Sequence, residues 1–202
     1  MNKKIFLLLF YICITLYGCT NITESKIYGD DLPLELKEYM SKNIKISDNK
    51  CVEYEGWLDD EEKCYRVAIE YKEEQQGKYR HSEDYFLFFS ENEIECVYVD
   101  YTKEQIGADR YVWDACDFSA YLEDVTFDDK LDLIISLGHA GASGDLVYCA
   151  YVYNDGKYVY VKSFEEIVNY KLDRENKLII SGGSDSCVYQ YNGEEFLKKV
   201  VD

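Results

Sequence analysis

This 202-residue sequence has few prolines, histidines and basic residues: one proline, two histidines, and 22 lysines and arginines against 40 aspartates and glutamates. A formal charge of −18 argues against nucleic acid or anionic lipid as the ligand, because both repel an acidic surface. His81 and His139 are the only ordinary bases, and no serine lies in a G-x-S-x-G context. We therefore expect a protein that is not an enzyme and does not bind nucleic acid.

The sequence also lacks a stretch long enough to span a membrane, which requires about 20 apolar residues. The apolar run near the N-terminus covers 13 residues, 5–17, and it follows Lys3 and Lys4. Gly18-Cys19 comes directly after it, which is the charged, apolar and small-residue order of an export signal. We therefore expect residues 1–18 to be a signal peptide, with a retained helix as an alternative.

Leu16-Tyr17-Gly18-Cys19 resembles the lipobox of bacterial lipoproteins, in which the cysteine is acylated and becomes the new N-terminus. The resemblance implies two or three acyl chains such as palmitate on Cys19, which would hold the protein stably at a membrane. We expect a lipid anchor on the extracytoplasmic face of the cell membrane, and the alternative is ordinary secretion. Residues 19–31 would then be a polar tether, and residues 32–202 a single β domain.

Residues 19–202 retain 20 basic and all 40 acidic residues, a side-chain charge of −20. Such a surface attracts cationic partners or metal ions, and the alternative is a solvated acidic coat that keeps the protein soluble. Apart from Cys13 and Cys19, six cysteines remain, and an even set is compatible with three disulfide bonds in an oxidising compartment. They are Cys51, Cys64, Cys96, Cys116, Cys149 and Cys187. Cys51 and Cys64 bracket an expected turn and are the first pair expected to form a disulfide, and the alternative is that the cysteines are buried free thiols.

The 21 tyrosines and the alternation of apolar and polar residues favour strands. A short helix is expected at 32–40, where Pro33 precedes apolar residues at helical spacing. Strands are expected at 65–71, 85–89, 94–101, 131–137, 146–153, 158–162, 187–191 and 196–201. Asn154-Asp155-Gly156 and Asn192-Gly193 predict hairpin turns. The predicted fold is all-β, an antiparallel β-sandwich or barrel-like domain with one short N-terminal helix, and no repeat supports a propeller.

Oxygen-bearing side chains recur at every second position from Asp124 to Asp132, which is the arrangement that wraps hard oxygen ligands around calcium. Asp124, Thr126 and Asp128 would supply side-chain oxygens, Lys130 its carbonyl, and Asp132 a direct or water-bridged carboxylate. The pattern resembles the D-x-N-x-D-G-x-x-D loop of FG-GAP and VCBS-type extracellular modules. Residues from about 118 to 200 resemble bacterial periplasmic and surface proteins with one such loop in a calcium-binding β-sandwich. The alternative is an acidic turn whose aspartates bond to backbone amides.

The segment from Gly138 to Asp145 is glycine-rich, which predicts a flexible connection between strands. Ser143, Gly144 and Tyr148 resemble the protruding loop with which periplasmic lysozyme inhibitors enter the enzyme's cleft. These features together predict a membrane-anchored extracytoplasmic binding module, stabilised by calcium, for a protein or glycan ligand. The alternative function is a proteinaceous inhibitor of a lysozyme-type cell-wall hydrolase.

Overall fold

The computed structural model describes residues 32–72, 79–91, 93–101, 112–114, 119–140, 144–182 and 186–199. Residues 1–31, which include the expected signal, Cys19 and the tether, lie outside these ranges. The elements are α2 (Leu34–Asn43), β1 (Lys50–Asp59), β2 (Cys64–Lys72), β3 (Tyr79–Phe89), β4 (Ile94–Asp100), β5 (Val112–Asp114), β6 (Ala120–Glu123), β7 (Asp132–Ala140), β8 (Asp145–Asn154), β9 (Lys157–Tyr160), the 3-10 helix η1 (Lys162–Glu166), β10 (Lys171–Asp173), β11 (Leu178–Ser181), β12 (Cys187–Tyr191) and β13 (Phe196–Lys199).

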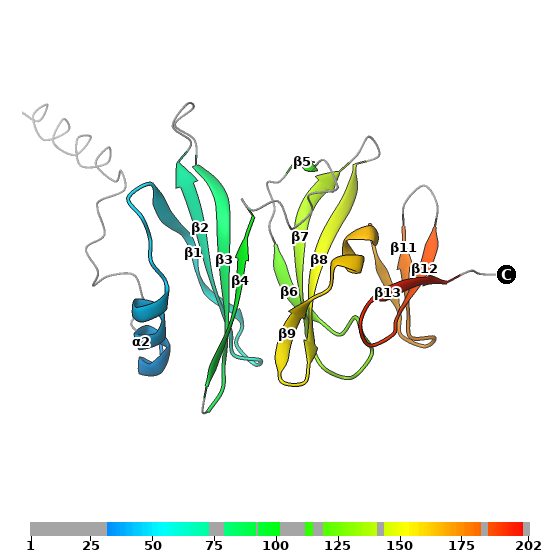
Figure 1. Ribbon diagram of the computed structural model, residues 1–202, viewed down its shortest axis with the longest axis horizontal. Helices are drawn as coiled ribbons and strands as arrows, with labels where there is room; N and C mark the ends of the chain where they lie inside the picture. The colour runs from blue at the N-terminus through cyan, green and yellow to red at the C-terminus, as the bar shows by residue number, and fades with distance from the viewer. Residues whose placement is uncertain are drawn as a thin grey trace, which may run out of the picture.

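The strands form three antiparallel sheets, which stack face to face (Figure 1). Sheet A has the order β1-β2-β3-β4, and sheet C has the order β10-β11-β12-β13. Sheet B has the order β5-β7-β8-β9, with β6 also paired to β7. Helix α2 covers the outer face of sheet A, so the layers run from α2 through sheets A and B to sheet C.

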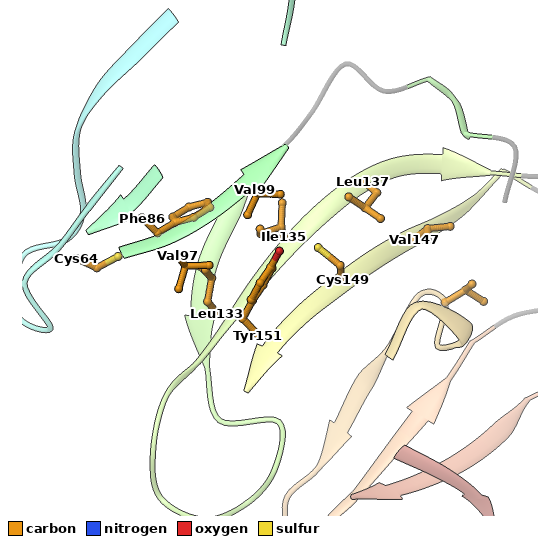
Figure 2. Close-up of a cluster of buried hydrophobic side chains, with 11 residues drawn as sticks. Cys64, Phe86, Val97, Val99, Leu133, Ile135, Leu137, Val147, Cys149 and Tyr151 are labelled. Carbon is orange, nitrogen blue, oxygen red and sulfur yellow. The ribbon is translucent and has the colours of Figure 1, made fainter. Parts of the chain in front are cut away.

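Apolar side chains from alternate strand positions fill the space between sheets A and B. Figure 2 shows Phe86 and Val97 of sheet A facing Leu133, Ile135 and Tyr151 of sheet B. Burying a side chain such as Phe86 completely contributes about 1.5–3 kcal/mol to folding. This contact therefore fixes the two sheets against each other.

Two further clusters complete the stack. Ile134 and Val152, on the opposite face of sheet B, pack with Phe164 of η1 and with Ile179 and Tyr189 of sheet C. On the outside of sheet A, the buried face of α2 contacts the strands beneath it. This third cluster includes Leu36 and Met40 of α2 and Val67, Ile69 and Leu87 of sheet A.

The all-β prediction with one short N-terminal helix is confirmed, but the sheets do not close into a barrel. Three sheets form the stack because both faces of sheet B are apolar and each face is covered by another sheet. The predicted hairpin between β8 and β9 is also confirmed, since Asn154 pairs with Lys157. Asp155 and Gly156 at its tip have φ values of 48° and 84°, as the favoured two-residue hairpin turn requires.

The expected bridge between Cys51 and Cys64 is wrong, because the two residues lie at opposite ends of the β1–β2 hairpin. Cys64 pairs with Asp59, whereas Cys51 pairs with Glu70. Cys51 and Asp59 are eight residue steps apart on β1, or about 26 Å at ~3.3 Å per residue, far beyond the Cα separation of a disulfide. Among the cysteines of the described residues no disulfide is formed, and Cys116 lies outside those residues. Burial raises the pKa of Cys64 to about 12, so this thiol is protonated and unreactive.

Candidate functional site

The first candidate site is the loop that joins β6 to β7. Asp124, at its start, accepts hydrogen bonds from the backbone amides of Phe127 (2.6 Å), Asp128 (3.2 Å) and Asp129 (3.1 Å). The backbone is left-handed at Phe127 and Asp129, where φ is 62° and 66°. Asp129 stands where glycine makes the sharp turn of a calcium loop, and its backbone adopts the conformation that glycine favours.

Asp132 closes the same loop from the other end. Its side chain is fully buried at the start of β7 and accepts hydrogen bonds from the amides of Val125 (3.0 Å), Thr126 (3.2 Å) and Tyr153 (3.0 Å). Burial raises the pKa of this carboxyl to about 6, although the three amides act to lower it. A single carboxyl group therefore ties the loop to the end of β8.

The fit of calcium to this loop is partial. Asp128 accepts a hydrogen bond from the Lys130 amide at 3.0 Å, and the Thr126 hydroxyl donates to Asp132 at 3.3 Å. In the described part of the chain, no group of three or more His, Cys, Asp or Glu side chains is arranged to hold a metal ion. The loop therefore has, at Asp129, the backbone turn of a calcium loop. Calcium would, however, compete with the backbone amides that already bond to the carboxylate oxygens of Asp124, Asp128 and Asp132.

The second predicted site is the segment of Ser143, Gly144 and Tyr148. Ser143 lies outside the described residues, and Gly144, with φ 68°, directly precedes β8. Tyr148 is half-buried on β8, and its ring packs edge-on against Tyr170, with 4.9 Å between ring centroids. Tyr148 packs at the edge of the cluster that joins sheets B and C.

A buried charge network, which the sequence pattern did not reveal, lies between sheets A and B. Asp84 of β3 is fully buried and accepts hydrogen bonds from Arg66 Nε and Nη2, both at 2.9 Å. The Tyr101 hydroxyl donates to Asp84 at 2.7 Å, and His81 Nε2 lies 3.0 Å from it. His81 Nδ1 lies 2.6 Å from a carboxylate oxygen of Glu53, so the imidazole links two carboxylates.

The electrostatics of the network favour charged His81 and neutral Tyr101. Burial alone would lower the pKa of His81, but hydrogen bonds and charge from Asp84 and Glu53 raise it. Burial and the charge of Asp84 raise the pKa of Tyr101 well above its ordinary value. These groups form hydrogen bonds and ion pairs with one another, and the network therefore links the strands of sheet A. Only the charged and polar run from Arg80 to Asp84, in a strand that ends in the apolar run from Tyr85 to Phe89, could have indicated it from sequence.

An open groove of about 450 Å³ lies between α2 and the turn that joins β3 to β4. The helix contributes Glu35, Glu38, Tyr39 and Lys42, which lie on one helix face because they are three or four residues apart. This site could not be predicted from the sequence, because the other wall comes from residues 89–91, 93 and 94, far along the chain. That wall contributes Phe89, Glu91, Glu93 and Ile94.

Apolar and acidic side chains both line the groove. Tyr39, Phe89 and Ile94 are half-buried and form what we call the groove floor, whereas its four glutamates are exposed. Lys42 forms a salt bridge with Glu38 at 3.3 Å. With one lysine against four glutamates, the formal charge of these side chains is −3, so the rim attracts cations.

Comparison with known proteins gave no match to any family model, to any curated protein or to any solved structure. Among the described residues, no helix is long and apolar enough to cross a membrane. The function of this chain therefore has to be inferred from its own residues. The leading candidates for a functional site are the groove and the Asp124–Asp132 loop.

Proposed function

We propose that this chain is a lipid-anchored binding module on the extracytoplasmic face of the cell membrane, with its ligand site in the groove between α2 and the β3–β4 turn. The observation that carries the binding function is the groove itself, since an open cavity with an apolar floor and polar rim is the usual form of a ligand site. The lipid anchor is supported by the order of Lys3 and Lys4, the apolar run 5–17 and Gly18-Cys19. The ligand is a protein or a glycan.

The anchor is tested by following the chain in cells treated with globomycin, which blocks processing of lipoprotein precursors. We expect the precursor to accumulate, and mass spectrometry of untreated cells to find fatty acid on Cys19. Cys19→Ser should abolish acylation. Normal processing in globomycin, or an unmodified thiol at residue 19, would contradict the anchor.

The binding site is tested by filling the groove with a large side chain. Asn43 is exposed at the groove, so Asn43→Trp should obstruct it without altering the core. The full chain carrying Cys19→Ala, which cannot be acylated, is incubated with delipidated cell envelopes and sedimented. We expect Asn43→Trp to reduce sedimentation, and Asn176→Trp, at the exposed β10–β11 turn, to leave it unchanged. Equal sedimentation of the parent and Asn43→Trp would contradict this placement.

We also propose that calcium stabilises the loop from Asp124 to Asp132. The favouring observation is the left-handed backbone at Asp129, which the turn of a calcium loop needs. Asp124, Thr126, Asp128 and Asp132 would supply side-chain oxygens, and Lys130 its backbone carbonyl. Because a proton and a cation compete for the Asp132 carboxyl, the gain in stability from calcium should be larger at pH 7 than at pH 5.

Inhibition of a cell-wall hydrolase of the lysozyme type is the alternative function. The acidic groove and the side-chain charge of −20 for residues 19–202 favour a basic partner, and a basic hydrolase is a partner of that kind. The full chain should then slow lysis of cell walls by lysozyme, and Ser143→Ala with Tyr148→Ala should remove the effect. Lysis at an unchanged rate would exclude this alternative.

A further inference from the structure

We infer that the groove between α2 and the β3–β4 turn receives a peptide segment that carries lysine or arginine next to an apolar side chain. This inference rests on the proposed binding function, and adds the chemistry of the ligand. The groove floor of Tyr39, Phe89 and Ile94 supplies the apolar contact, and the rim supplies negative charge. Its volume of about 450 Å³ is near the lower end of typical ligand pockets, so it suits a few side chains.

The charges on the rim are only partly neutralised within the chain. Lys42 pairs with Glu38, and both side chains are largely exposed. No described residue forms a salt bridge with Glu35, Glu91 or Glu93, which leaves these carboxylates available to a ligand. An anionic ligand would meet like charge on both walls of the groove, which excludes acidic peptides.

The floor favours a cation on an apolar stem. Lysine and arginine bury their methylene stems along apolar surface while the charged head stays at the water interface. A cationic head over the ring of Tyr39 or Phe89 would also be attracted by the negative face of the aromatic system. The same side chain can therefore use the floor and the rim together.

A bare metal ion fits the groove less well. The described residues hold no group of three or more carboxylate, imidazole or thiol side chains gathered at metal-binding geometry. Two of the glutamates come from α2 and two from the hairpin, so they flank the groove. Spread carboxylates suit the spaced charges of a peptide better than a single ion, which needs converging ligands.

The test measures binding of two fluorescent, amidated tetrapeptides to the full chain carrying Cys19→Ser in neutral detergent. One probe alternates lysine with phenylalanine, and the other alternates glutamine with phenylalanine. We expect the cationic probe to bind at least about tenfold more tightly. Glu35→Gln/Glu91→Gln/Glu93→Gln should weaken it about tenfold, because the two lysines of the probe then lose their exposed ion pairs with the rim. The control Glu175→Gln/Glu194→Gln/Glu195→Gln removes the same charge at turns of sheet C and should change affinity less than about twofold.

Several results would overturn the inference. They are equal affinity for the two probes, an equal loss in the groove and control variants, or no binding of either probe. Asn43→Trp then separates this inference from the binding function. If it weakens both probes while charge makes no difference, the groove remains a binding site and only the preference for cations is wrong. If Asn43→Trp leaves binding of either probe unchanged, the groove is not the site and both proposals fall. Matching melting temperatures for all variants establish that each is folded.

Discussion

Asp84→Asn is expected to remove about 3 kcal/mol of the free energy of unfolding. The parent carboxylate is fully buried and is contacted by Arg66 twice, by Tyr101 and by His81. Breaking a buried ion pair by removing one partner costs ~3–5 kcal/mol, because the other charge is left uncompensated. The asparagine keeps one acceptor oxygen, so we take the lower end of that range. A loss of this size corresponds to a fall in Tm of roughly 6–12 °C for a domain of this length.

The measurement is urea unfolding at pH 7, followed by tryptophan fluorescence, with Asp60→Asn as the control. Asp60 is exposed in the β1–β2 turn, so its replacement should change stability by less than ~0.5 kcal/mol. Adding Arg66→Met to Asp84→Asn should recover part of the loss, since the uncompensated guanidinium is then gone. A cost below ~1 kcal/mol for Asp84→Asn, or no recovery in the double variant, would refute the assigned role of the network.

Three further predictions concern pH, calcium and the β8–β9 turn. Because Asp84 and Glu53 raise the pKa of His81, its contribution to stability is present below pH 6.5 and is lost as the pH rises through the raised folded value. Urea titrations should show this decline, and His81→Gln should flatten it; a parallel decline in the variant would contradict the assignment. Calcium should raise the Tm relative to chelator in the parent but not in Asp128→Ala, and identical curves for the parent in calcium and chelator would count against the loop as a calcium site. Gly156→Val should lower stability by about 1–2 kcal/mol from the left-handed backbone alone, since nothing lies within 4 Å of the added Cβ, and unchanged stability would contradict that origin.

The strands best predicted from the sequence are those with clear alternation of apolar and polar residues or with a recognisable hairpin-turn motif. The pattern of 65–71 predicted most of β2, and Asn154-Asp155-Gly156 predicted the β8–β9 hairpin. The edge strand β1 was missed, because its burial pattern lacks regular alternation and its pairing with β2 is interrupted by register shifts. Sheet C could not be placed as a third layer, since packing of sheet B on both faces depends on residues far apart in the chain.

The candidate sites divide in the same way. Five expected positions of the Asp124–Asp132 loop are local in sequence, so their order could be read directly. The groove joins residues 35–43 to residues 89–91, 93 and 94, and only the packing of α2 on sheet A brings them together. The predicted disulfide between Cys51 and Cys64 was wrong because it was based on their close spacing in sequence. The long β1–β2 hairpin places the two residues at opposite ends.

The most direct test of the binding module is to map where a photoreactive lysine–phenylalanine peptide attaches to the full chain. After irradiation and proteolysis, mass spectrometry should find the adduct within residues 35–43 and 89–94, with Asn43→Trp suppressing it. Attachment spread over the turns of sheet C, or adducts in the groove residues that persist in Asn43→Trp, would contradict the groove as the ligand site.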